Sequence, residues 1–347
     1  MIRVALVGYG LAGRLFHAPL ISACDDLQLT TIVTSSPDRI AQAHEDHPGA
    51  AVVPDVETLL GHRDSYDLVV VATVNSAHVE VASAALDAGL PVVVDKPLAI
   101  TSPDAQLLVD RARGNELLLT VFQNRRYDSD QRTLRRLIDS GELGDVLRYE
   151  SRFERWRPKL TVGKWRETTL ASEGGGSLLD LGSHVVDQAI TLFGPVSHVY
   201  GEVDARRGGA DDDAFLALQH VSGVRSHLWV SSVAAAPGPR LRVLGTEAAY
   251  VVDDLDGQEE ALRAGRMPTD QGWGEEPAGQ WGRLVRGDEQ EPVPSERGAW
   301  DAFYPAVAAA LQDGVPPPVD PQDAVEVLRI LEAARASTRE ERVITLT

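Results

Sequence analysis

Met1-Ile-Arg-Val-Ala-Leu-Val7 leads without a linker into Gly8-Tyr-Gly10-Leu-Ala-Gly13. The first stretch is an apolar, β-branched run that predicts a strand. The second has the spacing of a dinucleotide-binding turn and opens an amphipathic helix from Ala12 to about Ser22. In such a turn Gly8 permits the tight bend, Gly10 lets the backbone approach a pyrophosphate, and Gly13 lets the helix pack closely on the strand. The helix N-terminus would then face the phosphates with its N–H groups. The alternative is a tight turn with a purely structural role.

The composition is that of a folded, acidic protein. The chain has 347 residues, of which 43% are hydrophobic, and its formal net charge is −19. This length exceeds one dinucleotide-binding unit, so we expect two domains, residues 1–122 and 123–347, with the last helix packed on either of them. Because an acidic chain has no basic stripe to replace phosphate counterions, nucleic-acid binding is not expected.

Cysteine usage and hydropathy predict a cytoplasmic protein. The single cysteine, Cys24, rules out an intramolecular disulfide and a cysteine zinc cluster, and we expect it to be a small apolar residue near the first helix. No basic-then-apolar leader precedes the first strand, and no apolar run reaches ~18 residues, so neither secretion nor membrane spanning is expected. Two acidic clusters, Asp211-Asp212-Asp213 and Glu275-Glu276, are interpreted as solvated loops, with a metal role as the less favoured alternative.

Strand and helix patterns alternate from residue 2 to about residue 122. Apolar runs such as Leu68-Val-Val-Val-Ala72 are typical of strands that are buried on both faces. The pattern predicts an α/β domain with a doubly wound parallel sheet, the Rossmann fold. The predicted strands are Ile2–Val7, Leu27–Val33, Ala51–Val53, Leu68–Ala72, Val92–Val94 and Leu117–Phe122.

After Phe122 the pattern changes to period-two stretches separated by Gly, Pro and Asp. These stretches predict an α+β domain with a large, mostly antiparallel, open sheet. An open face invites burial against a second copy, so we expect a homodimer or homotetramer through this sheet. Residues 257–296 are expected to be irregular. The predicted strands are Val146–Trp156, Val196–Ala205, Ala214–His220, Val224–Val233, Leu241–Leu244 and Tyr250–Val252, and the predicted helices are Ser129–Ser140, Ser177 to about Phe193, Ala299–Gln312 and Pro321–Arg339.

The end of the second strand indicates which dinucleotide is bound. An acidic residue there binds the ribose hydroxyls of NAD, whereas hydroxyls and an arginine accommodate the 2′-phosphate of NADP. The chain has Thr34-Ser35-Ser36-Pro37-Asp38-Arg39, in which Ser35, Ser36 and Arg39 are candidate phosphate donors. NADP(H) is therefore favoured and NAD(H) stays possible. Alternatively, Ser36-Pro37 only starts the next helix and Asp38 is an ordinary first-turn acid.

Two further strand ends carry candidate site residues. Thr73, Asn75 and His78 follow the fourth strand, at the sheet edge where such folds bind ligands, although Asn75 or Ser76 would equally serve to cap a helix. The fifth strand ends in Asp95-Lys96-Pro97, where Lys96 would project toward a nicotinamide and polarise a substrate oxygen. The alternative is a surface lysine. His17, in the first helix, is interpreted as a packing residue, with phosphate contact as the alternative.

Gly174-Gly-Gly-Ser177-Leu-Leu-Asp180-Leu-Gly-Ser-His184 predicts a helix with two different faces. Asp180 and His184 are four residues apart and share one face, while an apolar stripe that includes Leu181 and Val185 lies on another. A carboxylate can orient a histidine ring, and the pair suits a general acid/base that exchanges a carbinol proton. The alternative is a solvated helix pair. No metal is expected here, because further clustered ligands are missing.

In this order the motifs resemble the Gfo/Idh/MocA family of oxidoreductases, over nearly the whole chain. Asp95-Lys96-Pro97 stands where the family usually has Glu-Lys-Pro, so the acid is kept but is one methylene shorter. Two stretches are most similar to the branch that contains NADP-dependent scyllo-inositol dehydrogenases. They are Gly10-Leu-Ala-Gly13-Arg-Leu-Phe-His17-Ala-Pro19 and Phe122-Gln-Asn-Arg-Arg-Tyr-Asp128.

The resemblance implies an enzyme that transfers a hydride between nicotinamide and a secondary alcohol or ketone of a polyol, inositol or sugar. Its catalytic residues map onto Lys96, Asp180 and His184, and Asn124 is implied to line the cofactor and substrate site. His184 would exchange the hydroxyl proton, Asp180 would orient His184 and contact the substrate, and Lys96 would stabilise the developing alkoxide.

The remaining assignments complete the predicted site. Trp165 and Arg166 offer an aromatic face and a guanidinium group that would suit a hydroxyl-rich ring, although both would also suit an interface or a core. The predicted cofactor-binding residues are Gly8, Tyr9, Gly10, Leu11, Ala12, Gly13, Ser35, Ser36, Arg39, Thr73, Asn75, His78, Asp95, Lys96 and Asn124. Two other functions stay open: a dinucleotide-binding redox sensor without turnover, and an imine or enone reductase of the same fold.

Overall fold

The computed structural model describes residues 1–160 and 165–346, and it divides the chain into two compact units. The first unit comprises residues 1–124, 258–273 and 299–325. The second comprises residues 125–257, 274–298 and 326–347. The first unit therefore takes in two segments from the later part of the chain.

A parallel sheet of six strands forms the centre of the first unit. Its order is β3-β2-β1-β4-β5-β6, so the chain returns from β3 at one edge to β4 beside β1, and the winding direction reverses between β1 and β4. Four of the strands, β1, β4, β5 and β6, are almost fully buried, as their continuous apolar runs predict. The strands are β1 (Ile2–Val7), β2 (Leu27–Val33), β3 (Ala51–Val53), β4 (Leu68–Val71), β5 (Val92–Asp95) and β6 (Leu119–Phe122).

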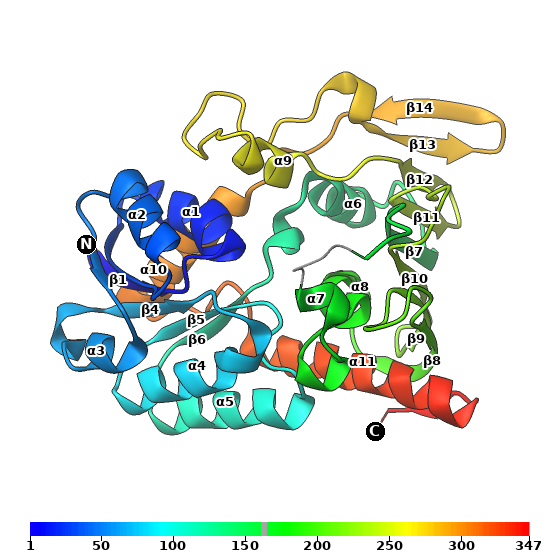
Figure 1. The fold of residues 1–347 in the computed structure, drawn as a ribbon. Coiled ribbons are helices and arrows are strands. Elements are labelled where there is room, and N and C mark those ends of the chain that lie inside the picture. Colours follow the sequence, from blue (N-terminus) through cyan, green and yellow to red (C-terminus); the bar gives the residue numbers. More distant parts are fainter. Residues whose placement is uncertain (161–164, 347) are drawn as a thin grey trace. The chain divides into compact units, whose positions relative to one another are not determined.

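Helices cover both faces of this sheet. Figure 1 shows α1 and α2 on one side of the strands and α4 and α5 on the other. The predicted Rossmann fold is thereby confirmed. The helices of this unit are α1 (Ala18–Ser22), α2 (Pro37–Asp46), α3 (Val56–Leu60), α4 (His78–Asp87), α5 (Ser102–Gly114), α9 (Gln258–Arg263) and α10 (Phe303–Asp313), together with the start of α11 (Pro321–Glu340).

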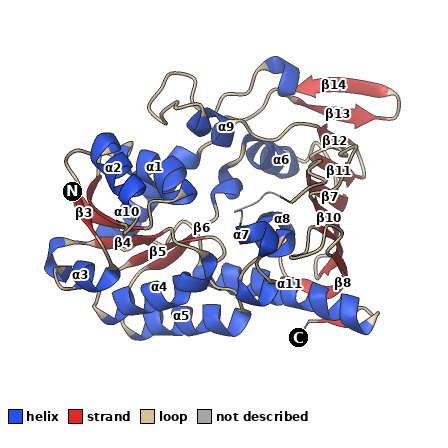
Figure 2. Ribbon diagram, viewed as in Figure 1, coloured by secondary structure: helices blue, strands red, loops and turns tan. Residues whose placement is uncertain are grey.

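A nine-stranded sheet forms the second unit, and the prediction of a large, mostly antiparallel sheet is confirmed. Its order is β14-β13-β12-β11-β7-β10-β9-β8-β15, and β7 and β10 form its parallel pair. Figure 2 shows these strands in red. They are β7 (Val146–Glu154), β8 (Val196–Asp204), β9 (Asp213–His220), β10 (Arg225–Ser231), β11 (Leu241–Gly245), β12 (Ala249–Val252), β13 (Gly282–Arg286), β14 (Glu289–Val293) and β15 (Ile344–Thr345).

Helices pack on one face of this sheet. The helices of the second unit are α6 (Ser129–Asp139), α7 (Trp165–Thr168), α8 (Ser183–Phe193) and the rest of α11. The approach of α11 to β8 is close, because a Cβ atom at Gly201 would lie only 2.6 Å from the carbonyl oxygen of Ala334. Along β9, Leu216 and Leu218 are buried on this covered face, whereas Phe215 and Ala217 point to the other face and are half-buried.

One predicted segment differs in the structure. Residues 257–296, expected to be irregular, contain α9 and the hairpin β13–β14, which extends the sheet beyond β12. Strand β14 reads Glu-Gln-Glu-Pro-Val and is exposed on both sides except at Val293, so it carries no period-two signal. The prediction was wrong here because backbone pairing at a sheet edge needs no apolar pattern.

Candidate functional site

The glycines of the first turn have the packing roles that their spacing predicts. Gly8 has a φ of 100°, and a Cβ atom there would lie 2.5 Å from the carbonyl oxygen of Ala72. Ala72 directly follows β4, the neighbour of β1 in the sheet. A Cβ atom at Gly13 would lie 2.0 Å from the carbonyl oxygen of Gly8. At Gly10 the nearest atoms belong to the Arg39 guanidinium group, 3.9 Å away. Only Gly10 therefore faces open space, which fits a position kept small for a ligand.

A hydrogen-bonded group at the end of α2 fixes that helix beside the glycine turn. Tyr9 is 1% exposed and its hydroxyl donates to Oδ2 of Asp46 at 2.9 Å, while Arg14 Nε donates to the same oxygen at 2.6 Å. The Arg14 guanidinium, together with the Tyr9 hydroxyl, holds the pKa of Asp46 below its usual value despite partial burial. The Tyr9 side chain thus ties the glycine turn to the end of α2. Leu11 is 48% exposed and Ala12 half-buried in the first helical turn.

The residues after β2 lie at the surface beside this turn. Ser35 and Arg39 are exposed, and Ser36 is the N-cap residue of α2 but makes no capping bond with its hydroxyl. Within residues 1–160 and 165–346, no hydrogen bond or ion pair engages the Arg39 guanidinium group. The guanidinium group would lie 3.9 Å from a Cβ atom built at Gly10, which places a cation beside the glycine turn. Asp38, also exposed, lies in the first turn of α2.

The loop after β4 is held to the loop after β5 by a buried histidine. His78 is fully buried, with Nδ1 2.8 Å from the carbonyl oxygen of Pro97 and Nε2 3.3 Å from that of Thr73. Its side chain thus joins the two loops. Asn75 is 2% exposed, and Thr73 is half-buried. The N-cap residue of α4 is Ala77, so neither Asn75 nor Ser76 caps this helix as one interpretation had it.

Lys96 follows β5, and its neighbour Asp95 is an ionised, buried carboxylate. Oδ1 of Asp95 accepts the backbone N–H of Lys96 at 2.9 Å and lies 3.6 Å from Nε2 of His17. Burial alone would raise the pKa of Asp95, but the His17 ring and the charge of Lys96 outweigh it and the pKa is lowered. Lys96 itself is half-buried. Since Asp95 pairs with Phe122 across the sheet, Lys96 and Asn124 follow neighbouring strands at the same edge.

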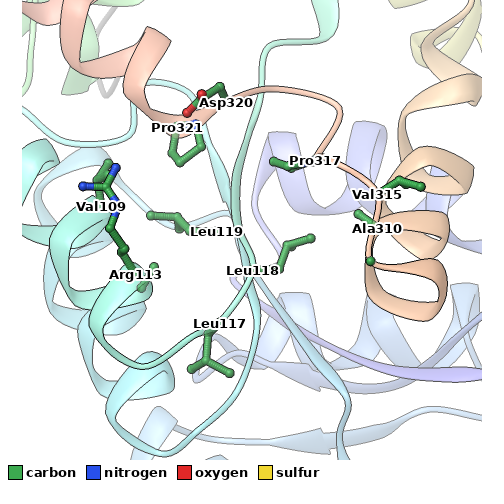
Figure 3. Close-up of a pocket in the computed structure, with 12 residues that line it drawn as sticks. Val109, Arg113, Leu117, Leu118, Leu119, Ala310, Val315, Pro317, Asp320 and Pro321 are labelled. Atoms are coloured by element: carbon green, nitrogen blue, oxygen red, sulfur yellow. The ribbon is translucent and has the colours of Figure 1, made fainter.

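A surface pocket in the first unit lies at the amino ends of the parallel strands, opposite to the glycine turn and Lys96. Its volume is about 280 Å³, and Figure 3 shows Leu117, Leu118 and Leu119 beside Ala310 and Pro321. Leu119 is the first residue of β6, so the pocket marks the amino ends of the strands. Ligands of open α/β sheets bind at the carboxyl ends, where Gly8, Thr73 and Lys96 lie. This pocket is therefore not the candidate site.

In the second unit, Asp180 and His184 lie where two helical geometries meet. Asp180 belongs to a π-helical turn, Leu178–Gly182, and His184 to the first turn of α8. Asp180 is half-buried and His184 is 5% exposed. The predicted regular helix is thus interrupted at the candidate site, as π turns often are at functional positions. The alternative of a solvated pair does not apply to His184.

An aromatic and cationic cluster surrounds His184. The ring of Phe153 lies 6.0 Å from the His184 ring, and the guanidinium groups of Arg125 and Arg240 lie 5.0 Å and 4.3 Å from the centroid of Phe153. Arg240 also donates to Oε1 of Gln188 at 2.9 Å, and Gln188 Nε2 donates to the carbonyl oxygen of Arg125 at 2.9 Å. Since Gln188 lies one turn after His184 in α8, this cluster fixes the helix that carries the histidine.

A second tie to α8 is an ion pair that the sequence did not reveal. Arg126 Nε donates to Oδ2 of Asp187 at 2.8 Å, and Nη2 donates to Oδ1 at 2.6 Å. The side chains are 13% and 2% exposed. Two fork-shaped bonds of this kind fix both the position and the rotation of the helix. The partners are 61 residues apart, so no local pattern could have indicated them.

The acidic run Asp211-Asp212-Asp213 is mostly not a solvated loop, which corrects that interpretation. Asp211 is 8% and Asp212 1% exposed. Oδ1 of Asp211 accepts the backbone N–H of Leu178 at 2.7 Å, and Oδ2 accepts from Arg335 at 2.8 Å. Asp211 thus caps the π turn of Asp180 and ties it to α11. Gly176 is required beside it, since a Cβ atom there would lie 2.1 Å from Oδ2.

Some predicted residues are placed without their role being tested. Asn124 is 6% exposed and ends the first unit. Trp165 and Arg166 belong to α7, but their side chains lie outside the described part of the structure, and their substrate contact stays a prediction. Cys24 is free and buried, as expected. Among the described residues no helix is long and apolar enough to cross a membrane.

The fold and the glycine turn define the class: an α/β protein with a dinucleotide-binding Rossmann unit. Family comparisons agree. Residues 2–123 match the oxidoreductase family with NAD-binding Rossmann fold of the Gfo/Idh/MocA group, and residues 135–346 match the C-terminal alpha/beta domain of the same group. The chain belongs to the Gfo/Idh/MocA family of oxidoreductases, and the predicted family and enzyme class are confirmed.

Individual relatives are similar over most of the chain. The scyllo-inositol 2-dehydrogenase (NADP(+)) IolW of Bacillus subtilis is 35% identical, over 99% of this chain and 96% of its own length. The D-glucoside 3-dehydrogenase of Escherichia coli is 30% identical over 56% of this chain and 54% of its own. The solved structure of YvaA from Bacillus subtilis superimposes with a TM-score of 0.93 at 35% identity, covering 100% of this chain and 98% of YvaA.

Proposed function

We propose that this protein is an NADP-dependent dehydrogenase that interconverts a secondary alcohol and a ketone on an inositol, another polyol or a sugar. The observation that carries the proposal is the set of residues at the carboxyl edge of the parallel sheet. The glycine turn follows β1, and Lys96 follows β5 with its backbone held by an ionised Asp95. The similarity to an inositol and a glucoside dehydrogenase supports the substrate class.

The residues beside the glycine turn favour NADP(H) over NAD(H). Arg39 is exposed and lies next to Gly10 in the first turn of α2, and Ser35 and Ser36 directly precede this helix. A guanidinium group binds a 2′-phosphate through paired, charge-assisted hydrogen bonds. The α2 helix that carries Arg39 is held in place through Asp46. NADP(H) supplies or accepts the hydride when bound, and NAD(H) is the less favoured cofactor.

We assign catalysis to Lys96, Asp180 and His184. The Lys96 ammonium group would stabilise negative charge as it develops on the substrate oxygen, which is the largest single effect in many enzymes. His184 would hold and return the hydroxyl proton, and Asp180 would orient its ring and bind the substrate. His184 is 5% exposed and lies beside Phe153, so little of its side chain is open to solvent. We add Asn124, Trp165 and Arg166 as proposed substrate contacts.

A cofactor-coupled assay tests this proposal. Inositols, aldoses and their keto forms are offered with NADP(H) and NAD(H) in parallel, and the absorbance of the reduced nicotinamide is followed. Because of the similarity to IolW, scyllo-inositol and its keto form come first. We expect turnover with NADP(H) and at least one polyol. Tight cofactor binding without turnover would contradict a dehydrogenase and favour a redox sensor, and turnover of imines or enones alone would favour the reductase.

Arg39 allows a specific prediction about the cofactor. Replacing Arg39 with alanine should raise the KM for NADP(H) by about 10-fold to 100-fold, because charge-assisted hydrogen bonds to a phosphate contribute about 1.5–3 kcal/mol. The KM for NAD(H), which has no 2′-phosphate, should change less than about twofold in the same variant. Equal changes for both cofactors would show that Arg39 does not select NADP.

The open face of the nine-stranded sheet supports a homodimer or homotetramer. On it, the Phe215 ring lies 5.0 Å from the Trp229 ring and 5.9 Å from the His227 ring, and the Arg152 guanidinium lies 3.9 Å from the centroid of Trp229. These side chains are half-buried within one chain. Aromatic rings with arginine are enriched where two copies pack together. We therefore propose that this face is the subunit interface.

A charged substitution on this face tests the assembly. Trp229→Glu should raise the dimer dissociation constant by at least about 30-fold, because a buried aromatic anchor contributes about 2 kcal/mol or more. The matched control is Val221→Glu, which changes an apolar residue that is 71% exposed in the turn between β9 and β10. Light scattering at several concentrations measures both. A monomeric parent protein, or equal behaviour of the two variants, would contradict the interface.

Two coarser predictions complete the proposal. We propose that residues 1–122 bind the cofactor, and that residues 123–347 bind the substrate and form the subunit interface. The two matched family segments support this division. We also propose that the enzyme works in the cytoplasm, in keeping with its one buried, unpaired cysteine.

A further inference from the structure

We propose that His17 and Tyr304 are positioning residues for Lys96, which they reach through Asp95. The proposal rests on the catalytic role proposed above for Lys96. It gives a function to two fully buried polar side chains of the first unit that neither the glycine motif nor the Asp-Lys-Pro motif includes.

The four residues form a continuous chain of polar contacts. The Tyr304 hydroxyl lies 2.7 Å from Nδ1 of His17, and Nε2 of His17 lies 3.6 Å from Oδ1 of Asp95. The same Oδ1 accepts the backbone N–H of Lys96 at 2.9 Å. The contact at 3.6 Å is electrostatic, and within the described residues Nε2 has no closer hydrogen-bond acceptor. His17 therefore acts on the oxygen atom that holds the backbone of the lysine.

The charge of Asp95 decides which atoms carry protons along this chain. An ionised carboxylate only accepts, so the stable tautomer of His17 carries its proton on Nε2, directed at Asp95. Nδ1 is then an acceptor, and the Tyr304 hydroxyl donates to it. Burial raises the pKa of Tyr304 well above its ordinary value, and the negative charge of Asp95 adds to this effect, so the hydroxyl stays a donor. The hydroxyl proton of Tyr304 is thus directed at His17, and the Nε2 proton of His17 is directed at the Asp95 carboxylate.

The surroundings of His17 are aromatic, so burying a polar ring there costs free energy unless the ring has a polar partner. The His17 ring lies 4.4 Å from the Phe122 ring and 6.2 Å from the Tyr304 ring, and Phe303 packs 4.9 Å from Phe122. A phenylalanine or leucine side chain would suit this environment without leaving a buried N–H short of a close acceptor. The imidazole is explained by its approach to Asp95.

The local backbone brings His17 to this position. His17 is the last residue of the π-helical turn Gly13–His17, which interrupts the helix predicted from Ala12. The π-helical turn thus begins at Gly13 of the glycine motif and ends at His17, whose ring faces the Asp95 carboxylate. From the other side, Nδ1 of His78 lies 2.8 Å from the carbonyl oxygen of Pro97. The Asp95-Lys96-Pro97 segment is thus held at both ends, with His17 on the side of Asp95 and His78 on the side of Pro97.

Three variants of the full-length protein test the proposal. His17→Gln places an amide nitrogen near the original Nε2 and keeps a donor toward Asp95, whereas His17→Asn places its amide near Nδ1 and reaches only Tyr304. Tyr304→Phe removes one hydroxyl and keeps the ring. Two readouts are needed: hydrogen–deuterium exchange of the Lys96 amide, and kcat and KM with the polyol identified in the cofactor assay.

We expect amide exchange at Lys96 to be roughly threefold to tenfold faster in His17→Asn than in the parent, with Tyr304→Phe between them and His17→Gln close to the parent. The kcat of His17→Asn should fall by about 10-fold to 100-fold, since small displacements of a catalytic group are costly, while the KM for NADP(H) stays within about twofold. His17→Gln should recover most of the loss.

Other results would overturn the proposal. Equal exchange at Lys96 in all variants would show that His17 does not hold this segment. Faster exchange in His17→Asn with an unchanged kcat would show that the contact has no bearing on catalysis, and equal losses in His17→Asn and His17→Gln would indicate a packing role. If the parent turns over no substrate, the proposed function fails, and equal exchange in all variants would still overturn the contact by itself.

Discussion

Replacing Lys96 with methionine should lower kcat for polyol oxidation by about 10²-fold to 10³-fold. Methionine keeps much of the side-chain volume but removes the charge that would stabilise the substrate oxygen. Because Asp95 accepts the backbone N–H of Lys96, which the substitution keeps, the strand end should keep its position. The affinity for NADPH, measured by fluorescence, should therefore change less than about threefold.

The matched control is Arg113→Met, which removes a cation at the opposite edge of the same sheet, beside the pocket of Figure 3. Its kcat should equal that of the parent. Asp180→Asn and His184→Ala should also lower kcat, each by about 10²-fold to 10⁴-fold, as loss of general acid/base catalysis does. If all three site variants kept turnover near that of the parent with a confirmed substrate, the catalytic assignment would be wrong.

Asp187→Asn should lower the free energy of unfolding of the second unit by about 3–5 kcal/mol, which would be the largest effect on stability of any change proposed here. Asp187 is 2% exposed and accepts two hydrogen bonds from Arg126, and breaking a buried ion pair by neutralising one partner costs far more than the pair contributes. Urea unfolding followed by tryptophan fluorescence measures the change. Because α8 also carries His184, kcat should fall in the same variant.

Two controls separate the buried pair from an ordinary surface pair. Glu291→Gln breaks the pair with Arg286, whose side chains are 59% and 44% exposed, and should cost less than about 1 kcal/mol. The double variant Arg126→Met, Asp187→Leu removes both charges and should recover much of the stability lost in Asp187→Asn. A loss in Asp187→Asn no larger than that in Glu291→Gln would mean that the pair does not stabilise α8.

A π-helical turn occurs beside the candidate site residues in each of the two units. One occurs at Gly13–His17, next to the cofactor glycines, and the other at Leu178–Gly182, around Asp180. In each case a side chain distant in sequence meets the turn: Tyr304 bonds to His17, and Asp211 accepts the N–H of Leu178. A π turn is less stable by itself than an α-helical turn, so tertiary contacts must hold it. No local pattern predicts such a turn.

The sequence alone was enough to predict the first sheet and to propose the residue types of the candidate site. Strands buried on both faces must be apolar throughout, and Gly8 and Gly13 admit no side chain because backbone atoms occupy the space. These are local requirements that are written in neighbouring residues, and the family resemblance extended them to Lys96, Asp180 and His184. The hairpin β13–β14 could not be predicted, since its pairing depends on backbone groups and not on an apolar pattern.

Only the tertiary structure decided which partners hold the segments that carry the proposed catalytic residues. Arg126 meets Asp187, Arg335 meets Asp211, and Tyr304 meets His17 across 61, 124 and 287 residues of chain. Each is a polar side chain that would read as a surface residue from its neighbours in sequence. Its burial becomes favourable only when the fold brings a charged or hydrogen-bonding partner to it, because an unpartnered polar group in the interior costs free energy. Such pairs arise from packing between distant segments, and the amino-acid pattern around either partner carries no trace of the other.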